Sequence, residues 1–132
     1  MKQRLLTILV VLLSIHLCGQ EGDTSDWQQI RDKIKEQDLI IEKDPANWSA
    51  IFKRAKYKTG IYKFTDANVD YNKAIELNPK EGKIYMGRAF NKDMLEDIKG
   101  AIQDYTKALD LDPGLTKAYG NIAFDKDILG GL

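Results

Sequence analysis

The chain has 132 residues, enough for one small domain or a short array of repeats. Lys and Arg together number 20, as do Asp and Glu, which excludes the basic excess that nucleic-acid binding usually requires. Hydrophobic residues make up 43% of the chain, so it can fold around a core of modest size.

Residues 1–19 predict a signal peptide. Lys2 and Arg4 precede an apolar run over residues 5–13, and the chain turns polar around Gly19. The run is too short to cross a membrane. We expect cleavage after Gly19 and export, with the product periplasmic or secreted. The alternative is a lipoprotein modified at Cys18, and only that modification would bring the chain to a membrane.

Cleavage there would remove the only histidine, His16, and the only cysteine, Cys18. The mature chain would then lack a thiol nucleophile, a histidine acid–base catalyst, a disulfide and any cysteine or histidine metal ligand. Carboxylates alone would have to support catalysis, and no spacing in the sequence singles out an acid pair. We therefore expect no catalytic residue, no metal and no cofactor.

Apolar residues recur at helical spacing after a polar linker over residues 20–25, and no stretch alternates as a strand would. The first helix has a polar gap at Gln37. Short turns separate the helices, so neighbours should be antiparallel. The sequence predicts an all-α fold with helices at about 26–43, 48–60, 65–77, 82–95, 98–111 and 115–129.

The three prolines of the chain, Pro45, Pro79 and Pro113, are evenly spaced, and the segment 70–79 returns in recognisable form at 104–113. A fixed period of about 34 residues is typical of solenoids in which each repeat stacks on its neighbours. The period divides the chain into a degenerate N-terminal helix (26–45), a first repeat (46–81), a second repeat (82–115) and an incomplete third repeat (116–132).

These repeats resemble the tetratricopeptide repeat (TPR) family, whose pattern has small residues where helices cross, aromatic residues between helices and a closing proline. The resemblance implies a short α-solenoid of antiparallel helix pairs, wound as a right-handed superhelix. Alanine at a crossing lets two helices approach closely. Lys92 stands where the family often has an aromatic residue, so we expect a looser helix pair there. The residues that carry the pattern are Ala55, Ala67, Tyr71, Ala74 and Pro79, then Tyr85, Ala89, Ala101, Tyr105, Ala108 and Pro113.

The resemblance also implies which side chains face the concave groove of the solenoid. We interpret them as a site for an extended or helical peptide segment; the alternative is that they only close the broad face of a middle helix. The family's clamp for a terminal carboxylate is not expected, because Phe52, Lys56 and Gly87 depart from it and only Lys117 fits. The groove residues are Phe52, Lys56, Lys83, Met86, Phe90, Lys117 and Phe124.

The sequence therefore predicts an exported, non-enzymatic interaction module, a scaffold or adaptor that binds a protein or peptide partner. A second hypothesis is structural. The last predicted helix has no partner helix within the chain, so it would drive self-association into a homo-oligomer. Under the same hypothesis the chain is a truncated array without a separate ligand.

Overall fold

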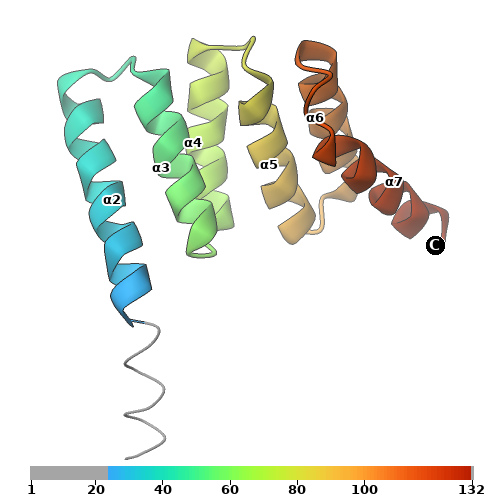
Figure 1. The fold of residues 1–132 in the computed structure, drawn as a ribbon, viewed down its shortest axis with the longest axis horizontal. Helices are drawn as coiled ribbons and strands as arrows, with labels where there is room; N and C mark the ends of the chain where they lie inside the picture. Colours follow the sequence, from blue (N-terminus) through green and yellow to red (C-terminus); the bar gives the residue numbers. More distant parts are fainter. Residues whose placement is uncertain (1–23, 132) are drawn as a thin grey trace, which may run out of the picture.

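The computed structural model describes residues 24–131, and the predicted signal peptide with Cys18 and His16 lies outside this range. The described residues form six helices and no strand, which confirms the predicted all-α fold (Figure 1). None of these helices is long and apolar enough to cross a membrane. The helices are α2 (Thr24–Lys43), α3 (Trp48–Gly60), α4 (Phe64–Leu77), α5 (Gly82–Met94), α6 (Ile98–Leu111) and α7 (Lys117–Gly130).

The prolines mark three of the helix ends. Helices α2, α4 and α6 each stop shortly before a proline, because the ring disfavours helical geometry at the residue that precedes it. The start of α3 is fixed by Asn47, whose Oδ1 accepts a hydrogen bond from the backbone N–H of Ala50 at 3.0 Å. Pro79 and Pro113 are not buried, so they end helices and contribute little to the core.

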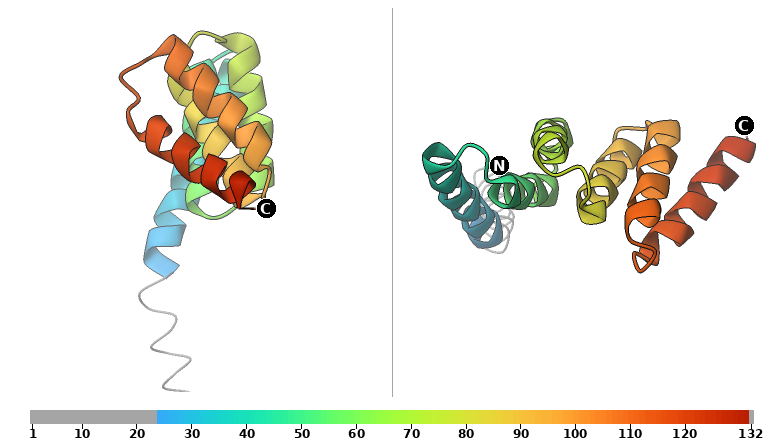
Figure 2. Two further views of the ribbon diagram at one scale, coloured as in Figure 1. Left: turned by 90° about the vertical axis from the view of Figure 1, so that its right-hand side faces the viewer. Right: turned by 90° about the horizontal axis from the view of Figure 1, so that it is seen from above.

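The helices follow one another in a row, and each packs chiefly against the next, as the view from above in Figure 2 shows. Helices α3 and α4 lie within the predicted first repeat, and α5 and α6 lie within the predicted second repeat. The turn inside each repeat contains one residue in the left-handed region, Tyr62 with φ 61° and Glu96 with φ 64°. These two residues occupy equivalent positions of successive repeats, so the backbone conformation of the turn is repeated as well.

Alanine and tyrosine side chains build the core between the helices. The six alanines expected at helix crossings are completely buried, and Tyr71 and Tyr105 are buried with them. Their small size brings α3 close to α4, and α5 close to α6, while each tyrosine ring fills the space beside the crossing. The buried residues of the TPR pattern are Ala55, Ala67, Tyr71, Ala74, Tyr85, Ala89, Ala101, Tyr105 and Ala108.

Two ion clusters lie inside the repeats. In the first, Arg54 and Lys58 on α3 bind the buried carboxylate of Asp70 on α4 at 2.7–2.8 Å. The second cluster stands at the equivalent place in the next repeat and consists of Arg88, Lys92 and Asp104. The expectation of a looser helix pair at Lys92 is wrong, because its amine reaches Asp104 at 2.9 Å and joins α5 to α6.

The arginine of each cluster also connects neighbouring repeats. Arg54 donates from Nη1 to Asp38 on α2 at 2.7 Å, and Arg88 donates from Nη1 to Asn72 on α4 at 2.8 Å. Gln37, which the sequence suggested as a polar gap, is 5% exposed. It therefore belongs to the buried side of α2.

Candidate functional site

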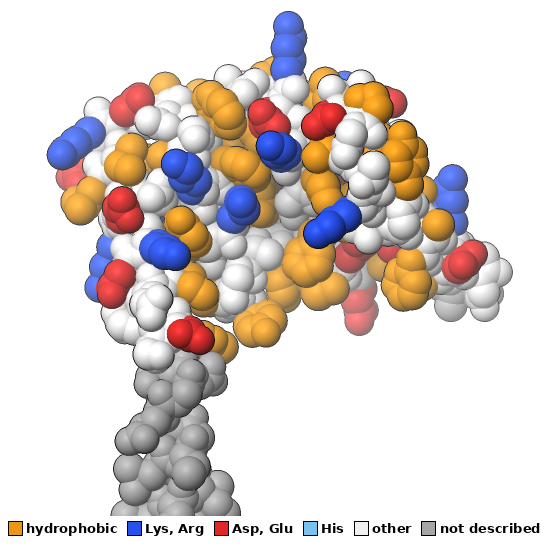
Figure 3. Space-filling model, in the orientation of Figure 1, with side chains coloured by type: hydrophobic (Ala, Val, Ile, Leu, Met, Phe, Trp, Pro, Cys, Tyr) orange, Lys and Arg blue, Asp and Glu red, His pale blue; other side chains and the backbone are white. Residues whose placement is uncertain are grey.

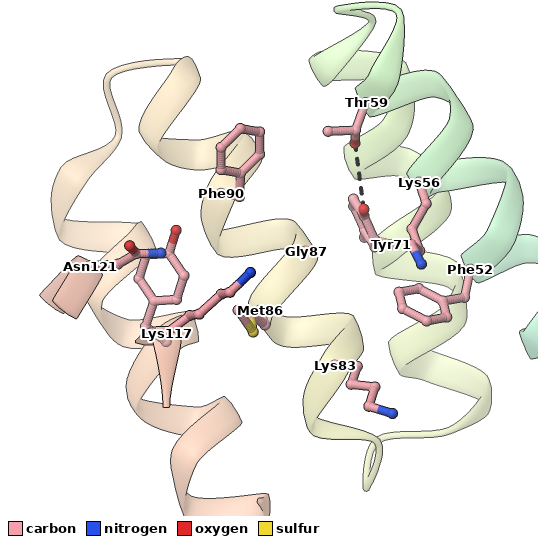
Figure 4. A pocket seen from close by; sticks show the side chains of 11 residues that line it. Phe52, Lys56, Thr59, Tyr71, Lys83, Met86, Gly87, Phe90, Lys117 and Asn121 are labelled. Atoms are coloured by element: carbon pink, nitrogen blue, oxygen red, sulfur yellow. Dashed lines mark hydrogen bonds between the residues drawn. The ribbon is translucent and has the colours of Figure 1, made fainter. Parts of the chain in front are cut away.

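A concave pocket of about 790 Å³ opens between α3, α5 and α7 (Figure 4). Tyr71 on α4 and Tyr105 on α6, both buried, also line it. Because α3, α5 and α7 are the first helices of successive repeats, they present equivalent faces to the same side. The structure brings six of the seven groove residues expected from the sequence into this pocket: Phe52, Lys56, Lys83, Met86, Phe90 and Lys117.

The floor of the pocket is apolar and closely packed. The rings of Phe52 and Tyr71 lie with their centroids 6.0 Å apart, and Met86 lies beside them on α5. Gly87 allows this arrangement, since a Cβ atom at that position would lie 2.7 Å from Cε1, Cζ and the hydroxyl of Tyr71. Such a distance is too short for carbon atoms in contact, so the floor depends on glycine at this position.

Three lysines surround the floor. Lys56 on α3 and Lys117 on α7 lie on opposite sides of α5, from which Lys83 projects (Figure 4). None of the three forms an ion pair with any residue in the range 24–131. The Nζ of Lys56 lies 5.7 Å from the centre of the Phe52 ring. The rim therefore offers uncompensated positive charge over an apolar floor.

A row of aromatic rings, most of them exposed, extends the apolar surface beyond the pocket. Phe90 packs edge-on against Phe64, and Phe64 packs in turn against Tyr62, with ring centroids 6.5 and 6.0 Å apart. Tyr62 also packs against Trp27 on α2, with the two ring centroids 6.2 Å apart. Figure 3 shows orange apolar side chains and blue lysine or arginine side chains intermixed on this face of the molecule. Apolar contact area and positive charge are thus available to one ligand.

Phe124 lies outside the main pocket, unlike the other six groove residues. It is 66% exposed and lines a second pocket of about 260 Å³, together with Met94 and Ile128. This second pocket shares Phe90, Tyr105 and Asn121 with the main one. The two pockets are therefore adjoining parts of one groove, which we call the main pocket and the side pocket.

The side pocket contains an acid pair that sequence reasoning missed. Asp93 on α5 and Asp125 on α7 lie within hydrogen-bonding reach of each other, and the hydroxyl of Tyr105 donates to Asp93 Oδ2 at 2.9 Å. Burial raises the pKa of Asp93 to about 6, against the opposing effect of the Tyr105 hydrogen bond, and the charges of Asp125 and Asp97 add to the rise. Burial also raises the pKa of Asp125.

No protein-family model matches this sequence. No curated protein sequence matches it either.

Several solved structures match in fold. The first TPR domain of Spaghetti (RPAP3) bound to the HSP90 peptide SRMEEVD superposes with a TM-score of 0.76 at 23% identity, covering 88% of this chain and 92% of that one. The first TPR domain of human RPAP3 gives 0.75 at 25%, over 79% and 82% of the two chains. The second, in complex with the HSP70 peptide SGPTIEEVD, gives 0.67 at 28%, over 70% and 78%. Residues 24–131 therefore have the fold of a TPR solenoid.

Proposed function

We propose that this protein binds a segment of a partner protein in the groove formed by α3, α5 and α7. The observation that carries the proposal is the main pocket, which combines an apolar floor of Phe52, Tyr71 and Met86 with a rim of three lysines. A preformed concave site with a few charged groups at its edge is typical of peptide recognition. Two of the RPAP3 domains described above, which share the fold, are bound to peptides.

The lysine rim indicates the chemistry of the segment. A carboxylate held near Lys56, Lys83 or Lys117 would gain a charge-assisted hydrogen bond, and apolar side chains beside it would cover the floor. Both RPAP3 ligands contain two adjacent glutamates and a final aspartate. We expect an acidic and apolar segment here as well. We do not expect recognition of a terminal carboxylate, since Phe52, Lys56 and Gly87 differ from the family's clamp.

The two RPAP3 domains whose structures contain a ligand bind peptides, and we propose the same non-enzymatic role here. Selection of a random peptide display library on the chain tests this function. Peptides that combine glutamate or aspartate with apolar residues should be enriched, and Lys83→Glu/Lys117→Glu should reduce their binding. A library from which no sequence is enriched would count against the proposal.

A second candidate function is self-association through α7. This helix packs chiefly against α6, and it exposes Tyr119, Phe124 and Ile128 at 54%, 66% and 37%. Exposed apolar side chains on one helix suit an isologous contact with a second copy. Light scattering decides between the candidates: a monomer removes this one, whereas a dimer that Ile128→Asp dissociates would support it.

We also propose that the chain is exported, with cleavage after Gly19, on the basis of the sequence pattern alone. The intact mass of the protein purified from the cell envelope tests this. A mass that begins at Gln20 supports simple cleavage, and a mass with acyl groups on Cys18 supports the lipoprotein alternative. A chain that retains residue 1 would contradict export.

A further inference from the structure

The junctions between successive repeats contain equivalent polar pairs of different chemistry. Between the first and second repeats, Thr59 donates from Oγ1 to Oδ1 of Asn91 at 3.0 Å, beside the hydroxyl of Tyr71 at 3.5 Å. The equivalent positions one repeat further along the chain are Asp93, Asp125 and Tyr105, at the next junction. A neutral pair at one junction is thus replaced by two carboxyl groups at the other.

The side chains of the neutral pair, Thr59 and Asn91, find their hydrogen-bond partners within the protein. Asn91 is completely buried, accepts from Thr59, and donates from Nδ2 to the backbone oxygen of Phe64 at 3.4 Å. The first junction therefore shows that the fold does not require a carboxylate at these two positions of the repeat. An uncharged hydrogen bond holds two repeats together at the same position.

The acid pair lacks such compensation. Asp125 is 2% exposed, and neither its Oδ2 nor Oδ1 of Asp93 receives a hydrogen bond from an N–H or O–H group of residues 24–131. The groups that face the pair are the Tyr105 hydroxyl and the Asp97 carboxylate from the α6 side, with the Asn121 side chain of α7 beside Tyr105. None carries positive charge. Shielding a carboxylate from water without a nearby cation is costly, so a positive group of a ligand would pair favourably with these two acids.

The walls around the pair suit a long cationic side chain. Phe90, Met94, Phe124 and Ile128 line the side pocket with Asp93 and Asp125. Phe90 is 44% exposed and Phe124 is 66% exposed, so both rings are open to a ligand. Lysine and arginine place their methylene stems along apolar surfaces, and aromatic faces attract their charged ends.

We propose that the side pocket is a subsite for the basic side chain of a bound protein segment, whose ammonium or guanidinium group pairs with Asp93 and Asp125. The inference rests on the proposed function and adds the direction in which the bound segment runs along the groove. The acidic residues of the segment would lie at the lysines of the main pocket, and a lysine or arginine would lie toward the end of the groove between α5 and α7. A metal ion suits the pair less well, because such ions usually take more ligands than two carboxyl groups provide. No group of three or more His, Cys, Asp or Glu side chains that could hold a metal ion occurs within residues 24–131.

The test uses one random peptide display library on three proteins: the natural chain, Asp93→Thr/Asp125→Asn, and Asp127→Asn. The double variant recreates the neutral pair of the first junction, so it is expected to fold. Asp127 is an exposed carboxylate on α7 outside both pockets, so its variant controls for charge. The natural chain and the control should enrich a basic residue at a fixed spacing from acidic ones, and the double variant should show no basic preference.

Affinity measurement completes the test. The double variant should bind the best selected peptide at least about tenfold more weakly, and replacing the peptide's basic residue by norleucine should remove this difference. Affinity for the natural chain should also fall as the pH is lowered through about 6, where Asp93 gains a proton. Peptides enriched without a basic residue, or with one that the double variant binds equally well, would overturn the subsite alone. A library without any enriched peptide would overturn the proposed function with it.

Discussion

Arg88 holds Asp104 through two parallel hydrogen bonds, from Nε to Oδ2 and from Nη2 to Oδ1, both 2.7 Å long. The same bidentate contact occurs between Arg54 and Asp70 in the preceding repeat. Such contacts fix the relative orientation of the two side chains as well as their distance. The helices of each repeat are therefore aligned by a buried charge contact as well as by alanine packing.

Asp104→Ala should destabilise the protein by about 3 kcal/mol, because it leaves Arg88 and Lys92 half-buried without their counter-ion. Chemical denaturation followed by circular dichroism measures the change. Asp110→Ala is the matched control, since Asp110 lies on the same helix but is exposed. A loss as small as that of the control, within about 0.5 kcal/mol, would show that the cluster contributes nothing.

Replacing all three charged residues of the second cluster should cost much less than removing Asp104 alone. In Arg88→Leu/Lys92→Leu/Asp104→Leu no charge remains buried without a partner, and apolar side chains fill the space. We expect the triple variant to recover most of the stability that Asp104→Ala loses, in the same denaturation experiment. A triple variant less stable than Asp104→Ala would mean that the ions supply net stabilisation.

Gly87→Ala should destabilise the protein by about 1–3 kcal/mol, because the added methyl group would overlap the Tyr71 ring beneath the main pocket. Gly120→Ala on α7 is the control: nothing lies within 4 Å of its Cβ position, so replacing a helical glycine there should stabilise by up to about 1 kcal/mol. Melting temperatures that shift in opposite directions would support the packing described here. Equal shifts would contradict it.

The acid pair predicts an unusual dependence of stability on pH. The pKa of Asp93 is raised from 3.8 to about 6 in the folded chain, so the folded state takes up a proton before the unfolded state does. The free energy of unfolding should therefore rise as the pH falls from 7 through about 6. This gain is complete below the unfolded pKa and is lost again as the pH rises through the folded value.

Asp93→Thr/Asp125→Asn should flatten that dependence and raise stability at pH 7 by about 1–2 kcal/mol, since it removes the buried carboxyl group of Asp125 and the half-buried one of Asp93. Denaturant titrations between pH 5 and 7.5 measure both effects, and Asp127→Asn should leave the slope unchanged. If the double variant keeps the natural slope, the acid pair does not titrate in this range.

The fold was largely predictable from the sequence because its main determinants are periodic. The regular spacing of prolines and alanines indicated the helix pairs, and the structure places helix ends close to those expected. The resemblance to the TPR family also implied which side of α5 faces the groove. Phe124 is the one expected groove residue that lies outside the main pocket. It lies one repeat beyond Phe90 on α7, and no further helix follows among the described residues to enclose it.

The charged contacts were harder to predict, since their partners are distant in sequence. Arg54 and Asp70 are 16 residues apart on different helices, so their contact depends on how the helices are aligned. The signal that could have found it is the recurrence of the same charges in the next repeat. For Asp93 and Asp125 the useful comparison is with Thr59 and Asn91, which shows that equivalent positions of the two junctions differ in charge.

The most direct measurement of the central claim is the affinity of a display-selected peptide for the natural chain, for Phe90→Asp and for Val69→Asp. Phe90 lines both pockets, whereas Val69 is 65% exposed on α4 and lines neither. Binding in the groove predicts a loss of at least about tenfold for Phe90→Asp and no change for Val69→Asp, with both variants still helical. Equal affinity for all three proteins would show that the groove is not the binding surface.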